Sequence, residues 1–131
     1  MAKNVLESSK VSKPVGIMSQ GVKASGGHLI FASGQVSRDI NGQTVGVGDI
    51  KAQTRQVLEN LKAVLEEGGA TMDDVVKVTV FVTDVAEQFA QIHEVRSEYW
   101  KDGYPASTLV EISALANPEL LIEIEALAVI P

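Results

Sequence analysis

The stretch VVKVTVFV at residues 75–82 constrains the fold most, because it reads as a β-strand with apolar residues on both faces. Its even positions are all valine, while its odd positions are more varied and include Lys77 and Phe81. Alternation with a period of two is the pattern of a strand. Helical patterns precede and follow it, so the chain is predicted to form a sheet with helices packed against it.

The first helix is predicted over residues 49–67. Its apolar positions recur with a period of about 3.6 and comprise Ile50, Val57, Leu58, Leu61, Val64 and Leu65. Asp49 is the expected N-cap, because its carboxylate can accept a hydrogen bond from a free backbone N–H of the first turn. Gly68 and Gly69 are expected to end the helix, because glycine adopts the left-handed conformation at little cost.

A second helix is predicted at about residues 85–100. Asp84 and Glu87 form an acidic variant of the capping box at its start. Its apolar positions, which should face the core, are Phe89, Ile92 and Tyr99.

Further strands are predicted where apolar residues alternate between turn signals, at residues 28–36, 43–47, 108–112 and 120–129. Segment 17–24 is expected to pair with strand 28–36 through a turn at Gly26-Gly27, and Asn41-Gly42 marks a second turn. The resulting order, β-β-(β)-α-β-α-β-β, predicts a single α+β domain over residues 1–131 with both helices on one face of the sheet.

The other face of this sheet is left without a cover. On strand 120–129, the residues assigned to the covered face are Ile122, Ile124, Ala126 and Ala128. The opposite face carries Phe81, Leu121, Leu127 and Val129, which together would make a larger apolar patch than monomers usually expose. Self-association through this face would cover the patch, so a homo-oligomer is predicted.

Composition and charge exclude several classes of function. The 131 residues are 45% hydrophobic and 21% charged, which is typical of a globular domain. The net charge of -6, with scattered Lys and Arg, argues against nucleic acid as a partner. Cysteine is absent, which excludes disulfides and thiolate chemistry. No apolar run is long enough to span a bilayer, so no membrane partner and a cytoplasmic location are expected.

No metal or cofactor is predicted. His28 and His93 are the two histidines, and neither has a carboxylate at ligand spacing. Gly46 and Gly48 lack the third glycine of a phosphate-binding loop, so they are interpreted as a flexible approach to the first helix. A Ser-His-Asp arrangement is also missing.

Glu123 and Glu125 are the polar residues most open to a functional interpretation. Both project from the uncovered face, about 6.6 Å apart by the strand rise. A carboxylate on an interface must be paired, hydrogen-bonded or protonated, so a glutamate in a salt bridge between subunits is the simpler interpretation. The alternative is a carboxylate lining a cleft, where it steers a water or a proton. Ser33 and Gly34 either present a hydroxyl and an N–H to a ligand or form a bulge.

Four segments, in this order and spacing, carry a resemblance to a known family: SGQVSRD, DIKAQTRQVLENLKAVLEEGG, DDVVKVTVFVTD and IEIEALAV. They closely resemble the reactive intermediate deaminase family, also called RidA/YjgF or endoribonuclease L-PSP-like, over roughly residues 16–129. The resemblance implies a chorismate-mutase-like α+β fold, a homotrimer with a central β-barrel, and clefts between subunits. It also implies hydrolysis of enamines and imines to 2-oxo acids and ammonia, with an arginine holding the carboxylate and a glutamate positioning the water.

Several positions depart from the family pattern. The segment that resembles "PARS" reads Pro105-Ala106-Ser107-Thr108, so Ser107 stands where the resemblance implies the arginine. Met18 replaces a tyrosine of a GPYSQ-like segment, and His93 replaces an asparagine. The water-positioning residue implied by the resemblance, Glu123, is retained, as are Ser33 and Gly34. The substrate-binding residues expected from the resemblance are therefore Ser33, Gly34, Met18, His93, Ser107 and Thr108.

Loss of the arginine leaves two functions open. The first is an altered deaminase or hydrolase for a small imine or enamine, with the usual 2-imino acid activity expected to be weak. The second is a non-catalytic protein that binds a small metabolite in the cleft. Arg96 is the candidate replacement cation, since it lies three residues after His93 on nearly the same helical face; the simpler interpretation is a surface arginine. Ribonuclease activity is disfavoured by the acidic charge balance.

Overall fold

The structure is a computed structural model that describes residues 2–131. Its elements, in chain order, are β1 (Ala2–Leu6), β2 (Gly21–Ser25), β3 (His28–Val36), α1 (Ile50–Glu67), the short 3-10 helix η1 (Met72–Asp74), β4 (Val75–Val82), α2 (Val85–Arg96), β5 (Ala106–Glu111) and β6 (Ile122–Ile130). The predicted strand at 28–36, the strand at 75–82 and the first helix are confirmed. The strands predicted at 108–112 and 120–129 are confirmed with their ends shifted by one or two residues.

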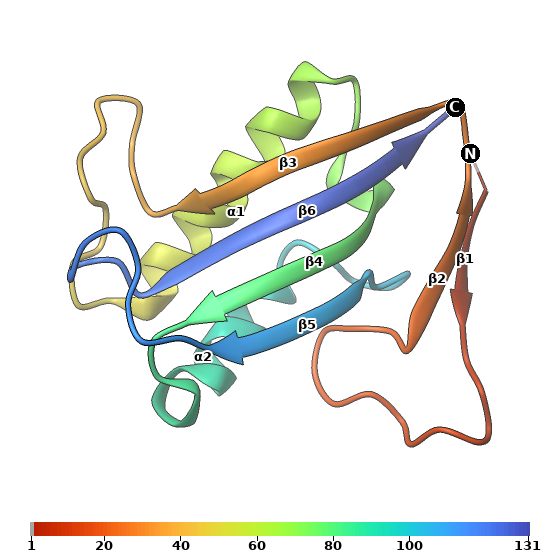
Figure 1. The fold of residues 1–131 in the computed structure, drawn as a ribbon, viewed down its shortest axis with the longest axis horizontal. Coiled ribbons are helices and arrows are strands. Elements are labelled where there is room, and N and C mark those ends of the chain that lie inside the picture. The colour runs from red at the N-terminus through yellow and green to blue at the C-terminus, as the bar shows by residue number, and fades with distance from the viewer. Residues whose placement is uncertain (1) are drawn as a thin grey trace.

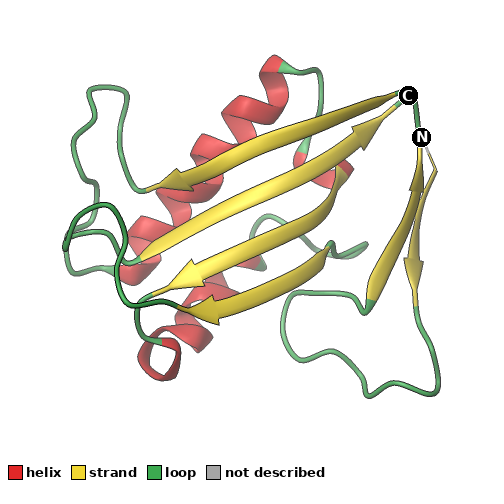
Figure 2. Cartoon of the chain, in the orientation of Figure 1, coloured by secondary structure: helices red, strands yellow, loops and turns green. Residues whose placement is uncertain are grey.

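Four strands form one mixed sheet in the order β3-β6-β4-β5. β6 runs antiparallel to both β3 and β4, whereas β5 lies parallel to β4. Both helices pack on the same face of this sheet, behind the strands in Figures 1 and 2. The predicted α+β arrangement with one covered face is therefore confirmed.

The core lies between the helices and the covered face of the sheet. All four even positions of β4 are buried, and Ile122, Ile124, Ala126 and Ala128 of β6 are buried beside them, as predicted. From α1, the side chains of Val57, Leu58, Leu61 and Leu65 are completely buried. The prediction was wrong for Val64, which is 38% exposed because it lies at the edge of the stripe, beside the segment that follows β3.

The predicted caps hold, with one difference. Asp49 accepts a hydrogen bond from the Ala52 N–H at 3.1 Å, and Gly69 after α1 has a φ of +85°. At the start of α2, Asp84 accepts from the Glu87 N–H at 3.2 Å. The reciprocal bond of the capping box comes from Gln88, whose Oε1 accepts from the Asp84 N–H at 3.0 Å, rather than from Glu87.

The second helix ends at Arg96, earlier than the predicted residue 100. The chain tightens there, because the N–H groups of Glu98 and Tyr99 bond to carbonyls three residues back. This turn directs Trp100 into the core, where its Nε1 donates to the Met72 carbonyl at 2.9 Å. Burial of one large side chain therefore decides where α2 ends.

The predicted pairing of segment 17–24 with strand 28–36 is wrong. β2 instead pairs antiparallel with β1, a strand that the sequence patterns did not indicate. This separate hairpin stands across the end of the main sheet (Figure 1). Gly26 and Gly27 connect this hairpin to β3. Both glycines lie against the C-terminal end of β6 and the residue that follows it. A Cβ at Gly26 would lie only 2.7 Å from the Ile130 carbonyl oxygen, so a glycine is needed at this contact.

The strand predicted at 43–47 is also wrong, although the turn that suggested it is present. Gly42 has a φ of +78°, and a single bridge joins Arg38 to Thr44. Asp39 stabilises the turn, because its carboxylate accepts from the N–H groups of Asn41 and Gln43 at 2.9 and 3.0 Å. These side-chain bonds take the place of a strand ladder.

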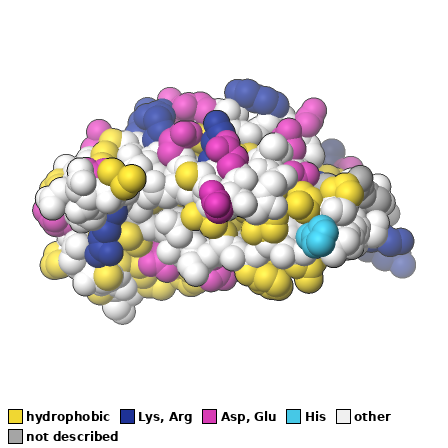
Figure 3. Space-filling view, turned by 90° about the horizontal axis from the view of Figure 1, so that it is seen from above, with side chains coloured by type: hydrophobic (Ala, Val, Ile, Leu, Met, Phe, Trp, Pro, Cys, Tyr) yellow, Lys and Arg dark blue, Asp and Glu magenta, His cyan; other side chains and the backbone are white. Residues whose placement is uncertain are grey.

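The open face of the sheet carries exposed apolar side chains, but not at the four predicted positions, since Phe81 and Leu127 are half-buried and Leu121 packs against the core. Leu29 and Phe31 of β3 are 60% and 73% exposed. Val129 is 5% exposed, contrary to the prediction, because the approach of Gly26 covers it. Figure 3 shows charged side chains along the helix side of the molecule and hydrophobic ones along the sheet side.

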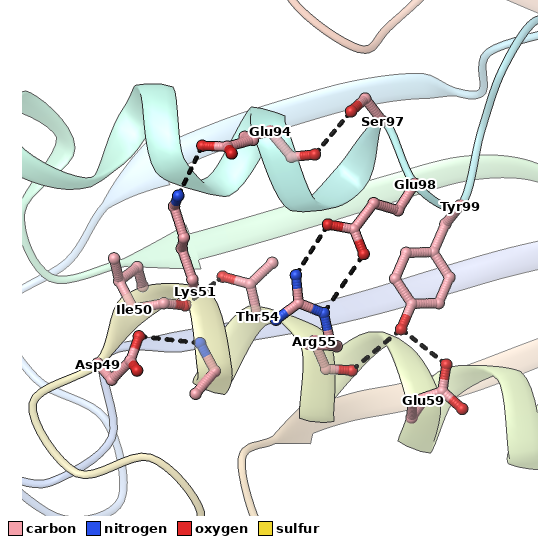
Figure 4. A network of polar contacts seen from close by, with 11 residues as sticks. Asp49, Ile50, Lys51, Thr54, Arg55, Glu59, Glu94, Ser97, Glu98 and Tyr99 are labelled. Carbon is pink, nitrogen blue, oxygen red and sulfur yellow. Dashed lines mark hydrogen bonds and ion pairs between the residues drawn. The ribbon is translucent and has the colours of Figure 1, made fainter.

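Charged residues link the two helices on their outer surface (Figure 4). Lys51 pairs with Glu94 at 2.8 Å, and Arg55 with Glu98 at 2.8 Å. The Tyr99 hydroxyl donates to Glu59 at 2.7 Å. Exposed pairs contribute about 0–1 kcal/mol each, so these contacts add little to the stability of the fold.

Candidate functional site

The structure divides the predicted site residues into two clusters on opposite faces of the sheet. The carboxylate cluster comprises Glu123 of β6 with Ser33 and Gly34 of β3, on the open face. The arginine cluster comprises Arg96 and His93 of α2, Ser107 of β5, and Gly16 and Ile17, on the helix side. Within one chain these clusters do not meet, because successive residues of a strand point to opposite faces.

The carboxylate cluster is built on a β-bulge. The register between β3 and β6 shifts between Ala32 and Gln35, which leaves Ser33 and Gly34 as the irregular residues. The Glu123 side chain lies against Gly34, where any Cβ would collide with its Oε2. No ion pair within residues 2–131 involves this carboxylate. Its oxygens are therefore not neutralised by a cation of the same chain.

Arg96 is the central residue of the other cluster. Its side chain is 1% exposed, and Nη2 donates to the Ile17 carbonyl at 2.9 Å and to the Ser107 hydroxyl at 3.2 Å. The guanidinium lies 5.6 Å from the ring centroid of Trp100. Burial lowers the pKa of Arg96 to about 10, which still keeps it protonated at neutral pH.

The structure thus places a guanidinium beside the hydroxyl of Ser107. The interpretation of Arg96 as a surface arginine is wrong, because Arg96 lies on the buried face of α2 with Ile92 and Val95. A polar residue in the apolar stripe beside Ile92 and Val95 was the sequence signal that could have revealed its burial.

His93 lies beside the same segment. Its Nδ1 is 2.9 Å from the Phe89 carbonyl oxygen, and since a carbonyl only accepts, Nδ1 carries the proton. In the neutral ring Nε2 is then an acceptor, next to Gly16, where a Cβ would collide with the imidazole. Gly16 has a φ of +96°, so a glycine suits this position for two reasons. Burial, with Arg96 as a smaller cause, lowers the pKa of His93.

This lowered pKa predicts a pH dependence of stability. The unfolded chain takes up the imidazole proton more readily than the folded chain, so the free energy of unfolding falls as pH drops below about 6.5. His93→Asn should reduce this fall, as measured by urea unfolding from pH 8 to pH 4.5. His28→Asn, at an exposed position, serves as the control. Equal pH profiles for wild type and His93→Asn would contradict the prediction.

Met18 and Thr108 lie in different surroundings. Met18 is half-buried and lines a cavity of about 340 Å³ together with Leu6 of the hairpin and Tyr104. Thr108 is exposed on the open face, where its hydroxyl accepts from the Lys77 ammonium at 2.7 Å. Neighbours in sequence, Ser107 and Thr108 therefore belong to opposite faces, and Thr108 is not part of the arginine cluster.

Residues 2–131 contain no cluster of three or more His, Cys, Asp or Glu side chains that could hold a metal ion. None of the helices described here is both long enough and apolar enough to cross a membrane.

Comparison with known proteins identifies the family. The family model described as Endoribonuclease L-PSP matches residues 9–130. A RutC family protein of Pyrococcus abyssi is 47% identical over 128 residues, which cover 98% of each chain. The chain belongs to the Rid family. A further member, a 2-iminobutanoate/2-iminopropanoate deaminase of Dermatophagoides farinae, is 31% identical over 98% of this chain and 97% of its own.

The structural comparison agrees with the sequence. The Rid family protein YyfB of Yersinia pestis, whose function is described as unknown, superposes with a TM-score of 0.90. It is 37% identical, and the superposition covers 99% of this chain and 100% of the other. The chorismate-mutase-like arrangement of two helices on a mixed sheet, expected from the sequence segments, is thereby confirmed for this Rid protein.

Proposed function

We propose that this Rid protein hydrolyses a small imine or enamine and releases ammonia, in a cleft formed between copies of the chain. The observation that carries the proposal is the position of Glu123, a carboxylate without a cationic partner among residues 2–131, held against Gly34 on the open face. The related deaminase of Dermatophagoides farinae supports the reaction class.

The division of the site residues supports a cleft between copies. Glu123 lies on the open face with the exposed Leu29 and Phe31, whereas Arg96 and Ser107 lie on the helix side near β5. A second copy packed against the open face covers its apolar side chains and can bring its own arginine cluster toward Glu123. A homotrimer with the open faces inside is the assembly proposed for this purpose.

The reaction balances with water as the only co-substrate. Glu123 accepts a proton from a water molecule as the water oxygen attacks the carbon of the C=N bond, and Glu123 then passes this proton to the nitrogen. The resulting carbinolamine loses ammonia as its C–N bond breaks, and a 2-oxo acid remains. An enamine reaches the same route once its carbon is protonated to the imine.

The test uses 2-iminopropanoate generated in the assay by a dehydratase acting on serine. Ammonia release above the spontaneous rate, together with a trimer by light scattering at micromolar concentration, is the expected result. Saturable binding of the product pyruvate without faster hydrolysis would favour a protein that binds the metabolite without turnover. A stable monomer that neither binds nor hydrolyses would contradict the proposed function.

A further inference from the structure

Arg96 is the one charged residue among residues 2–131 whose side chain is fully buried. Removing a charge from water is costly unless an opposite charge compensates for it. Both ion pairs in this part of the chain involve other residues, and the acceptors of Arg96 are the uncharged Ile17 carbonyl and Ser107 hydroxyl. The chain therefore holds a buried cation whose own surroundings supply no anion.

The hydrogen bonding of this guanidinium is also incomplete. A guanidinium has five N–H donors, and Nη2 makes the two bonds described above. The Nε atom of Arg96 is buried and has no acceptor within the described residues. An unpaired buried donor is unfavourable, whereas a carboxylate could bond to two adjacent donors of one guanidinium. The group thus lacks both the charge and the acceptor atoms that a carboxylate would provide.

Residues 16–18 cover this guanidinium. The segment is fixed to the start of β5, where the Ser19 N–H donates to the Pro105 carbonyl at 3.1 Å. Its bond to Arg96 goes through one neutral acceptor, the Ile17 carbonyl. A carboxylate would add a negative charge and a second acceptor oxygen, which the Ile17 carbonyl does not supply, so it should compete with that carbonyl for the guanidinium. A cavity of about 340 Å³, lined by Met18 and Leu6, begins at the residue after Ile17 and has room for a short alkyl group.

We infer that Arg96 is the anion-binding residue for a small 2-oxo or 2-imino monocarboxylate, and that the ligand carboxylate displaces the Ile17 carbonyl from it. The inference rests on the proposed function, because it assigns the group that holds the substrate in the same cleft. Ser107 contributes as the second acceptor, which orients the guanidinium. The cation thus comes from α2, whereas β5 supplies a hydroxyl.

The experiment compares pyruvate with pyruvamide, which differ in the charge that Arg96 is expected to recognise. Affinities are measured by NMR titration for wild type, Arg96→Gln and Arg96→Lys. Wild type should prefer pyruvate roughly ten- to a hundredfold. Arg96→Gln should bind both ligands equally within about threefold, and Arg96→Lys should keep part of the preference because it keeps the charge but not the planar donor pair. Arg55→Gln is the matched control, since Arg55 pairs with Glu98 at the surface.

A purely structural role for Arg96 gives a different pattern. Arg96→Gln would then weaken pyruvate and pyruvamide to the same extent, and the preference for the charged ligand would survive. If Arg96→Gln does not fold, Arg96→Lys decides, because an unchanged preference in that variant would equally overturn the inference. Wild type could also hydrolyse 2-iminopropanoate while both Arg96 variants still prefer pyruvate over pyruvamide as strongly as wild type does. The proposed function would then stand, and only the role of Arg96 would be lost.

Displacement of Ile17 has its own measurement. Lys10 lies in the exposed segment before residue 16 and is followed by Val11, so trypsin cleavage after Lys10 reports on release of this segment. Pyruvate should speed cleavage several-fold in wild type and not in Arg96→Gln, whereas pyruvamide should have little effect. Slower or unchanged cleavage of wild type in saturating pyruvate would show that the ligand does not displace the Ile17 carbonyl.

Discussion

Glu123→Gln is expected to lower the rate of ammonia release from 2-iminopropanoate by roughly 10²–10⁴-fold. The substitution keeps the size of the side chain and its place against Gly34, but glutamine cannot accept a proton from water at neutral pH. Binding of pyruvate should change much less, because the carboxylate of Glu123 is not the group proposed to hold the ligand. Steady-state rates and NMR titrations of the same preparation measure the two effects.

Glu125→Gln is the matched control for this prediction. Glu125 lies two residues further along β6 on the same face, where it is exposed, and it takes no part in the proposed reaction. Its replacement should leave the rate within about threefold of wild type. Equal losses in the two variants would show that the open face needs negative charge for assembly rather than Glu123 for catalysis, and light scattering would detect the loss of the trimer.

A mixing experiment tests whether the two clusters act across copies. Glu123→Gln and Arg96→Gln chains are each expected to be nearly inactive by themselves. When they are unfolded together and refolded, random assembly leaves both wild-type clusters at roughly one interface in four, so about a quarter of the wild-type activity should return. No recovery from mixed trimers would mean that both residues of one site belong to the same chain.

Trp100→Ala should cause the largest loss of stability, about 3–5 kcal/mol in the free energy of unfolding. The indole is 1% exposed, so its removal leaves a large cavity between η1, α2 and the sheet. It also leaves the Met72 carbonyl without the Nε1 donor at 2.9 Å. Urea unfolding at a matched protomer concentration measures the change, since assembly makes apparent stability depend on concentration.

Trp100→Phe separates the two contributions. Phenylalanine fills much of the space but has no N–H group, so a loss of about 1–3 kcal/mol is expected from the unpaired Met72 carbonyl and the remaining gap. A loss in Trp100→Ala no larger than in Trp100→Phe would contradict the view that the indole fills a tight core. A change under about 1 kcal/mol in both would refute the account of how α2 ends.

Local patterns were enough to predict most of the framework. The valines of β4, the stripe of α1 and its Asp49 cap indicated their elements because period and capping depend on neighbours in sequence. The partner of β2 was harder to predict, because either β1 or β3 could pair with it. The choice of β1 does not depend on residues that are neighbours in sequence. The strand expected at 43–47 failed for a related reason, because Asp39 satisfies the turn through its side chain.

By itself, the sequence determined the sheet with one covered face, the open apolar face, the family segments and the replacement of an expected arginine by Ser107. Only the tertiary structure decided where a guanidinium lies. Arg96 and Ser107 are eleven residues apart, and they meet because the buried face of α2, which includes Ile92, Val95 and Arg96, packs on the sheet beside β5. That contact depends on packing between elements, which residue spacing along the chain does not encode.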